Sequence, residues 1–187
     1  MKWVKKMVRA NNHEIDENTA AELVEYCEPG MDDILNEIVK LCAYSGDRKR
    51  ITIDDIKKVC TKSVKSRIFD LTDAVAAGQC SRALALLNDM AAIKEPMPKV
   101  MYMITRQFRQ LLQIKLMSRE GAVQAEIVRQ LKINPYIAGK VVKQASSFSI
   151  DKLERAVAAS ADMDLKVKSG KIQDKAAVEL LIIGITS

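Results

Sequence analysis

The chain has 187 residues, of which 30 are lysine or arginine and 24 are aspartate or glutamate, so its formal net charge is +6. Hydrophobic residues make up 48% of the chain, whereas aromatic residues make up 4%, and there are only 7 glycines and 4 prolines. This balance excludes a disordered or fibrous protein, and the shortage of turn-forming and β-favouring residues disfavours a β-sandwich or barrel. No apolar run approaches the roughly 18 residues of a membrane span, and the charged start is not typical of a signal peptide. The sequence therefore predicts a soluble, all-α protein with no membrane partner.

Cysteine and histidine usage bears on catalysis and metal binding. Four cysteines stand at positions 27, 42, 60 and 80 without a CxxC pair, and His13 is the only histidine. Zinc sites typically use closely spaced Cys and His ligands, and a Ser or Cys nucleophile needs an imidazole beside it. The common phosphate-binding loops, GxxxxGK[ST] and GxGxxG, do not occur in the sequence. We therefore expect no catalytic residue, no metal and no cofactor. We interpret Cys27, Cys42 and Cys60, which stand among apolar residues at helical spacing, as small buried hydrophobes that stay reduced in a cytoplasm.

The first 61 residues show the helical pattern four times. In each segment apolar residues recur at spacings of three and four, which indicates one buried face per helix. Asp16 or Asn18 is the expected N-cap of the second helix. Thr52, followed three residues later by Asp55, predicts a capping box at the start of the fourth. These segments predict a four-helix unit over residues 1–61.

Composition and charge change after this unit. Residues 62–66 contain one apolar side chain and are predicted to form a linker. Residues 1–66 have no net charge, so the whole excess of +6 belongs to residues 67–187. That second part again shows helical periodicity, including a long helix that starts near Pro98 and a helix capped by Ser149. Residues 166–175 are predicted to be a polar connector before a last helix over residues 176–185, which is so apolar that it must be covered on several sides.

Four stretches, in the same order and with compatible spacing, resemble the delta subunit of bacterial DNA polymerase III. The first, residues 30–41 (GMDDILNEIVKL), is similar to a helix of the family's lid domain. The other three are residues 68–75 (IFDLTDAV), 106–112 (RQFRQLL) and 162–170 (DMDLKVKSG). Together they extend over nearly the whole chain, and the last departs mildly from the family's usual Lys-Thr-Gly because it ends in Lys-Ser-Gly.

The resemblance implies an architecture and a role. It implies a small helical lid of the AAA+ type over residues 1–61, a linker over 62–66, and a helical collar over 67–187 that assembles a clamp-loader ring with other clamp-loader subunits. The family's ATPase-like N-terminal domain, which contacts the sliding clamp, would then lie outside this sequence, which would be a fragment. Related ATP-binding lids carry an arginine three residues after the glycine equivalent to Gly30. Here that position is Asp33, whose negative charge would repel a phosphate.

Two basic groups are candidate contacts for a partner or for DNA. Arg106 and Arg109 are one turn apart and are expected on the same helix face, where they could hold a phosphate or a partner carboxylate. Lys166, Lys168 and Lys171 could contact DNA phosphates. The alternative for the arginines is a solvated helix face opposite Phe108, and the alternative for the lysines is a connector kept soluble by its charge.

The sequence thus leaves two hypotheses for the function. The first is a non-catalytic scaffold of the replicative clamp loader, which reaches DNA through the assembled complex in the bacterial cytoplasm. It would belong to a DNA polymerase holoenzyme without catalysing a reaction itself. The second is a stand-alone helical nucleic-acid-binding module, motivated by the +6 excess of residues 67–187. Against the second, the basic residues are spread over many helices with few aromatic residues among them.

Overall fold

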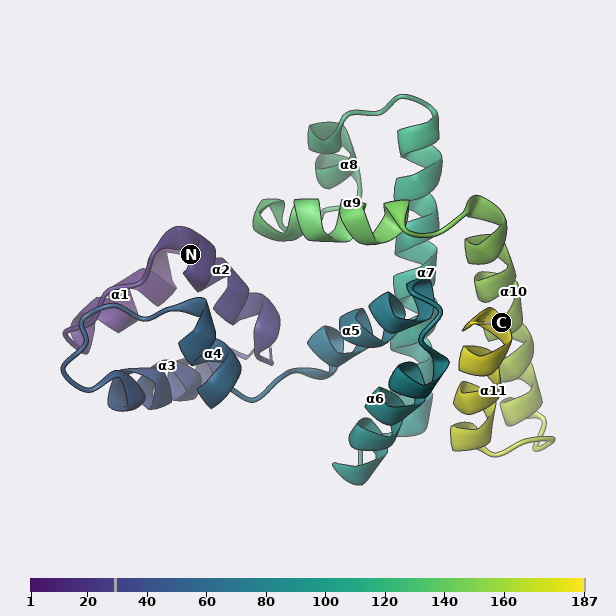
Figure 1. Ribbon diagram of the computed structural model, residues 1–187, viewed down its shortest axis with the longest axis horizontal. Coiled ribbons are helices and arrows are strands. Elements are labelled where there is room, and N and C mark those ends of the chain that lie inside the picture. Colours follow the sequence, from purple (N-terminus) through teal and green to yellow (C-terminus); the bar gives the residue numbers. More distant parts are fainter. Residues whose placement is uncertain (29, 187) are drawn as a thin grey trace. The chain divides into compact units, whose positions relative to one another are not determined.

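The computed structural model describes residues 1–28 and 30–186, and its secondary structure is helical (Figure 1). The predicted all-α class is confirmed, since these residues contain only one isolated β-bridge, between Glu14 and Arg50, and no strand. They also include no helix with the length and apolarity needed to cross a bilayer. The chain divides into two compact units, residues 1–66 and 67–187.

Unit 1 is built from four amphipathic helices. These are α1 (Lys2–Ala10), α2 (Glu17–Tyr26), α3 (Met31–Ser45) and α4 (Ile53–Val59). Helix α3 packs against α1 and α4, and α2 packs against α4, so the apolar stripes meet in one core. Its fully buried side chains include Val8, Leu23, Ile38, Leu41 and Ile56. Burying side chains of this size contributes about 1.5–3 kcal/mol each, which makes this core the main source of the unit's stability.

Local capping signals set where these helices start. Asp16, not Asn18, is the N-cap of α2, and its Oδ1 accepts a hydrogen bond of 2.8 Å from the backbone N–H of Thr19. Thr52 and Asp55 form the predicted capping box of α4. Such caps satisfy backbone N–H groups that have no partner within the helix, and each typically contributes about 1 kcal/mol.

The predicted linker over residues 62–66 is corrected in part. Residues 64–66 form the first turn of α5 (Val64–Ala76), and both Ser63 and Val64 are buried. The backbone N–H of Ser63 donates to the carbonyl of Tyr26 at 2.7 Å, and that of Val64 donates to Glu28 Oε1 at 3.0 Å. Ser63 and Val64 are thus packed against the end of α2 and the segment that follows it, which provide the hydrogen bonds that buried backbone groups need.

Unit 2 is organised around one long helix. It contains the rest of α5, then α6 (Cys80–Ala92), α7 (Met97–Arg119), α8 (Gln124–Gln130), a 3₁₀ turn (Pro135–Ile137), α9 (Ala138–Ser146), α10 (Ile150–Lys168) and α11 (Asp174–Thr186). Helix α7 packs against α8, α9, α10 and α11, and α11 also packs against α6 and α10 (Figure 1). Proline in the first turn of α7 and a Ser149 side chain that accepts from the N–H of Lys152 match the predicted helix starts.

A buried glutamine joins three helices of unit 2. Gln144 of α9 donates from Nε2 to the carbonyl of Phe69 at 2.9 Å and to Asp73 Oδ1 at 2.7 Å, both on α5. Its Oε1 accepts a hydrogen bond of 2.6 Å from Gln107 Nε2 on α7. The side-chain amide therefore has partners on both its nitrogen and its oxygen, as a buried polar group requires, and it ties α5 and α9 to α7.

Candidate functional site

Arg106 and Arg109 lie next to each other on the solvent-facing side of α7. Both side chains are exposed, whereas Ile104, Phe108 and Leu111 on the opposite side are buried. This is the arrangement of the solvated-face alternative, and it also leaves both guanidinium groups accessible to a partner. Their role as contacts stays a prediction.

The basic residues near residue 168 lie differently from the predicted connector. Lys166 and Lys168 belong to the last turn of α10, so the connector is shorter than predicted and α11 begins at Asp174. Lys166 Nζ is 2.7 Å from Asp162 Oδ2, and Lys168 Nζ is 2.5 Å from Asp164 Oδ2. These pairs have the i,i+4 spacing of a helix surface, and each lysine shares its charge with an aspartate. Lys171 is exposed in the turn that follows.

Helix α11 has an apolar face that unit 2 itself leaves exposed. The side that packs on α6, α7 and α10 is fully buried and includes Val178, Leu181 and Ile182. On the opposite side Leu180 is 49% exposed and Ile183 is 41% exposed, three residues apart and therefore adjacent on the helix surface. A helix of a soluble protein normally places polar residues there. This exposed pair, Leu180 and Ile183, is the strongest candidate in unit 2 for a surface that another chain covers.

The start of α3 in unit 1 places a carboxylate where a phosphate-binding helix would need a cation. Gly30 is the N-cap of α3, and a Cβ placed on it would clash with Asp33 Oδ2, so the Asp33 carboxylate folds back over the helix N-terminus. A carboxylate is favoured there by the helix dipole. It occupies the end where an anionic ligand would otherwise be attracted, so this helix start is not suited to nucleotide chemistry.

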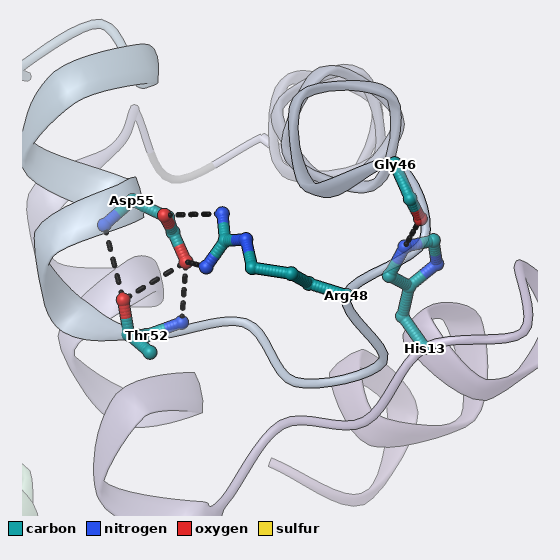
Figure 2. A network of polar contacts seen from close by, with 5 residues as sticks. All are labelled: His13, Gly46, Arg48, Thr52 and Asp55. Atoms are coloured by element: carbon teal, nitrogen blue, oxygen red, sulfur yellow. Dashed lines mark hydrogen bonds and ion pairs between the residues drawn. The ribbon is translucent and has the colours of Figure 1, made fainter.

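A polar network fixes the loop between α3 and α4, as Figure 2 shows. Arg48 donates through Nη2 to Asp55 Oδ1 at 2.9 Å and through Nη1 to Oδ2 at 3.3 Å. Asp55 Oδ2 also accepts from the Thr52 backbone N–H and hydroxyl, both at 2.9 Å. At the other end of the loop, His13 Nε2 is 3.2 Å from the carbonyl oxygen of Gly46. The loop is thus fixed by hydrogen bonds at both ends, which holds α3 and α4 in a defined position relative to each other.

This network makes the stability of unit 1 depend on pH. The Arg48 guanidinium hydrogen bond, assisted by the N–H and hydroxyl of Thr52, lowers the pKa of Asp55 from 3.8 to about 2 despite its burial. A carboxyl whose pKa is lower in the folded protein stabilises it above the pKa of the unfolded chain, and this stabilisation is lost as pH falls from about 4 to about 2. Because Arg48 is half exposed, we expect a loss of about 1–2 kcal/mol.

Urea denaturation across that pH range measures the effect. Asp55→Asn should remove this part of the pH dependence and lower the free energy of unfolding near neutral pH. Asp54→Asn, one position earlier and exposed, should leave both nearly unchanged. A pH dependence that is the same in Asp55→Asn and in the parent chain would contradict the assignment.

Unit 1 also contains a buried cluster of two thiols and a carboxylate. Cys27 ends α2, Cys60 ends α4 and Glu37 lies on α3, and their ligating atoms are all within 4.8 Å of one another. All three are buried. A hydrogen bond with Cys27, burial and the nearby Glu37 raise the pKa of the Cys60 thiol. Cys27 and Cys60 are free and buried as expected, but their contact with Glu37 was not predicted.

The sequence offers little signal for this cluster. Glu37 is 10 positions after Cys27 and 23 positions before Cys60, and the three belong to different helices. Neither a CxxC spacing nor a shared helix face therefore indicates the cluster. The one available clue is that Cys27 and Cys60 each stand at the end of a predicted helix, and only tertiary packing brings those two ends together.

Comparisons with known proteins connect both units to one family. The family model described as "DNA polymerase III delta subunit, C-terminal domain" matches residues 65–185. The chain is 30% identical, over 177 residues, to DNA polymerase III subunit delta of Bacillus subtilis (strain 168). This match covers 95% of this chain and 51% of that protein. Among solved structures it is similar to the Bacillus subtilis DNA clamp loader delta protein YqeN, with a TM-score of 0.80 and 29% identity over 99% of this chain and 55% of that one. The chain thus spans about half the length of these relatives.

Proposed function

Because this chain belongs to the DNA polymerase III delta-subunit family, we propose that it is the lid and collar part of a clamp-loader subunit, which acts as a non-catalytic scaffold. Residues 1–66 act as the helical lid and residues 67–187 as the collar that joins other clamp-loader subunits in a ring. The observation that carries the proposal is the similarity to a solved clamp loader delta protein over 99% of this chain.

Geometry supports a structural role for each unit. Asp33 covers the helix start that would attract a phosphate in unit 1, so ATP would be bound and hydrolysed by other subunits. In unit 2, Leu180 and Ile183 give α11 an exposed apolar face, and burial against a neighbouring collar would remove it from water. The chain would then transmit motion between subunits without reacting chemically.

The wider role follows from the same proposal. A region that corresponds to the half of the Bacillus subtilis relatives not matched by this chain would contact the sliding clamp. DNA would be reached through the assembled complex in the bacterial cytoplasm. The alternative, a stand-alone nucleic-acid-binding module, is not favoured. Several of the 18 basic residues of residues 67–187 are paired with carboxylates on the same helix, as Lys166 is with Asp162 and Lys175 with Glu179, which leaves fewer of them to contact phosphates.

Size-exclusion chromatography with light scattering tests the proposal. The purified chain should form a defined complex when mixed with the other clamp-loader subunits of the same bacterium, and it should show no ATPase activity alone. An unrelated helical protein of similar size serves as the control for non-specific association. Failure to form the complex, together with duplex DNA binding by the chain alone that weakens steeply with salt, would replace this proposal with the nucleic-acid-binding alternative.

A further inference from the structure

Three metal-ligating side chains converge in the core of unit 1, and neither the family nor the proposed function accounts for them. We propose that Cys27, Cys60 and Glu37 form a binding site for a thiophilic divalent cation of the Zn²⁺ class. The proposal stands independently of the clamp-loader role, because it rests only on the contacts of these three residues.

The spacing of the ligating atoms is close to what a tetrahedral site needs. With Zn–S bonds of about 2.3 Å, two sulfur ligands of one zinc ion lie about 3.8 Å apart. The ligating atoms of the cluster are within 4.8 Å of one another, so shifts of about 1 Å or less would bring them onto a common ion. Because Cys27 and Cys60 end their helices and are not in mid-helix, side-chain rotation with small backbone adjustment can supply such shifts.

Glu37 is already held in a suitable orientation. Lys40 Nζ is 2.7 Å from Glu37 Oε2, and the backbone N–H of Thr61 donates to the same oxygen at 3.3 Å. Both contacts use Oε2, so Oε1 can face the two sulfur atoms while Oε2 keeps its partners. Metal-binding carboxylates are typically fixed by hydrogen bonds of this kind behind the ligating atom.

Charge balance also favours a divalent cation. When a metal ion binds, the two thiols lose their protons to solvent, and the cluster then holds two thiolates and one carboxylate, a total of three negative charges. Lys40 contributes one positive charge at Glu37, and a divalent cation supplies the other two. The buried cluster becomes neutral overall, which is the condition for burying charges at acceptable cost.

The ligand set selects the kind of ion. Thiolates favour Zn²⁺ and similar soft or borderline ions, whereas Mg²⁺ and Ca²⁺ take oxygen ligands. Three protein ligands leave the fourth position of a tetrahedral ion to a small ligand such as water.

Cobalt titration of the whole reduced chain tests the site, with Co²⁺ as a coloured substitute for Zn²⁺. We expect one Co²⁺ per chain, an intense thiolate-to-cobalt charge-transfer band in the near ultraviolet, and loss of the band when Zn²⁺ is added. Glu37→Gln should weaken Co²⁺ binding by at least about tenfold. Loss of a residue that only hydrogen-bonds to a metal ligand typically weakens binding by about that much, and Glu37 is a ligand itself.

The other two cysteines provide matched controls. The double variant Cys42→Ser/Cys80→Ser should keep the band and the stoichiometry, whereas Cys27→Ser/Cys60→Ser should abolish the band. If the second variant fails to fold, the first still decides, because Cys27 and Cys60 are then the only thiols in the chain. The absence of a band in the parent chain, or its loss in Cys42→Ser/Cys80→Ser, would overturn the proposal.

Discussion

Replacing Phe108 by alanine is expected to lower the free energy of unfolding of unit 2 by about 3–5 kcal/mol. Phe108 lies in the middle of α7, the helix that contacts α8, α9, α10 and α11, and it is 1% exposed. Its ring meets Phe148 edge to face, with 6.0 Å between the centroids and 85° between the planes. The substitution removes a large buried side chain and so creates a cavity at the centre of the unit. It also leaves Phe148 without its aromatic partner.

Denaturation followed by circular dichroism measures this loss. Tyr102→Ala is the matched control, because Tyr102 is an aromatic residue on the same helix that is 65% exposed. Its replacement should change the free energy of unfolding by about 0.5 kcal/mol or less. Equal effects of the two substitutions would mean that Phe108 does not anchor the core of unit 2.

Replacing Leu180 and Ile183 together by aspartate is expected to weaken assembly with other clamp-loader subunits by at least about 100-fold. Burial of each of these side chains at an interface would contribute about 1.5–3 kcal/mol, and burying carboxylates in their place carries a further cost. Because both residues are exposed in unit 2 itself, the chain should remain folded. Circular dichroism checks the fold, and the dissociation constant with partner subunits measures the effect.

Val123→Asp is the control for this prediction. Val123 is an apolar residue of unit 2 that is 66% exposed and lies at the start of α8, away from α11 in the sequence. Its replacement should leave assembly unchanged. If the folded double variant assembles as tightly as the parent chain, the exposed face of α11 is not the surface that joins the ring.

The prediction from sequence was most successful where it depended on local interactions. Two helix caps show this, the capping box of Thr52 and Asp55 and the cap at Ser149. Each is a contact between residues three apart, so the spacing in the sequence is enough to predict it. Helix periodicity is equally local, and it predicted the all-α class. The four stretches that resemble the delta subunit are also readable in the sequence, and the comparisons confirm that family.

It was wrong in part where polar composition was used to place the segments between helices. Residues 62–66 were predicted to be a linker, yet Ser63 and Val64 are buried, and their backbone N–H groups donate to Tyr26 at the end of α2 and to Glu28 just after it. Lys166 and Lys168 were placed in a connector, yet aspartates one turn earlier pair with them and α10 continues through both. Polar residues are compatible with a helix whenever such partners are present, and composition does not report the partners.

The sequence by itself determined the helices, most of their starts and the family, because each depends on residues within about one or two helical turns or on a whole-chain pattern. Only the tertiary structure decided which surfaces are open and which side chains meet. It left Leu180 and Ile183 exposed on a helix that is apolar almost all round, and it brought Cys27, Glu37 and Cys60 together from three helices. Both outcomes depend on how helices distant in sequence pack against one another, and no spacing within a single helix encodes that packing.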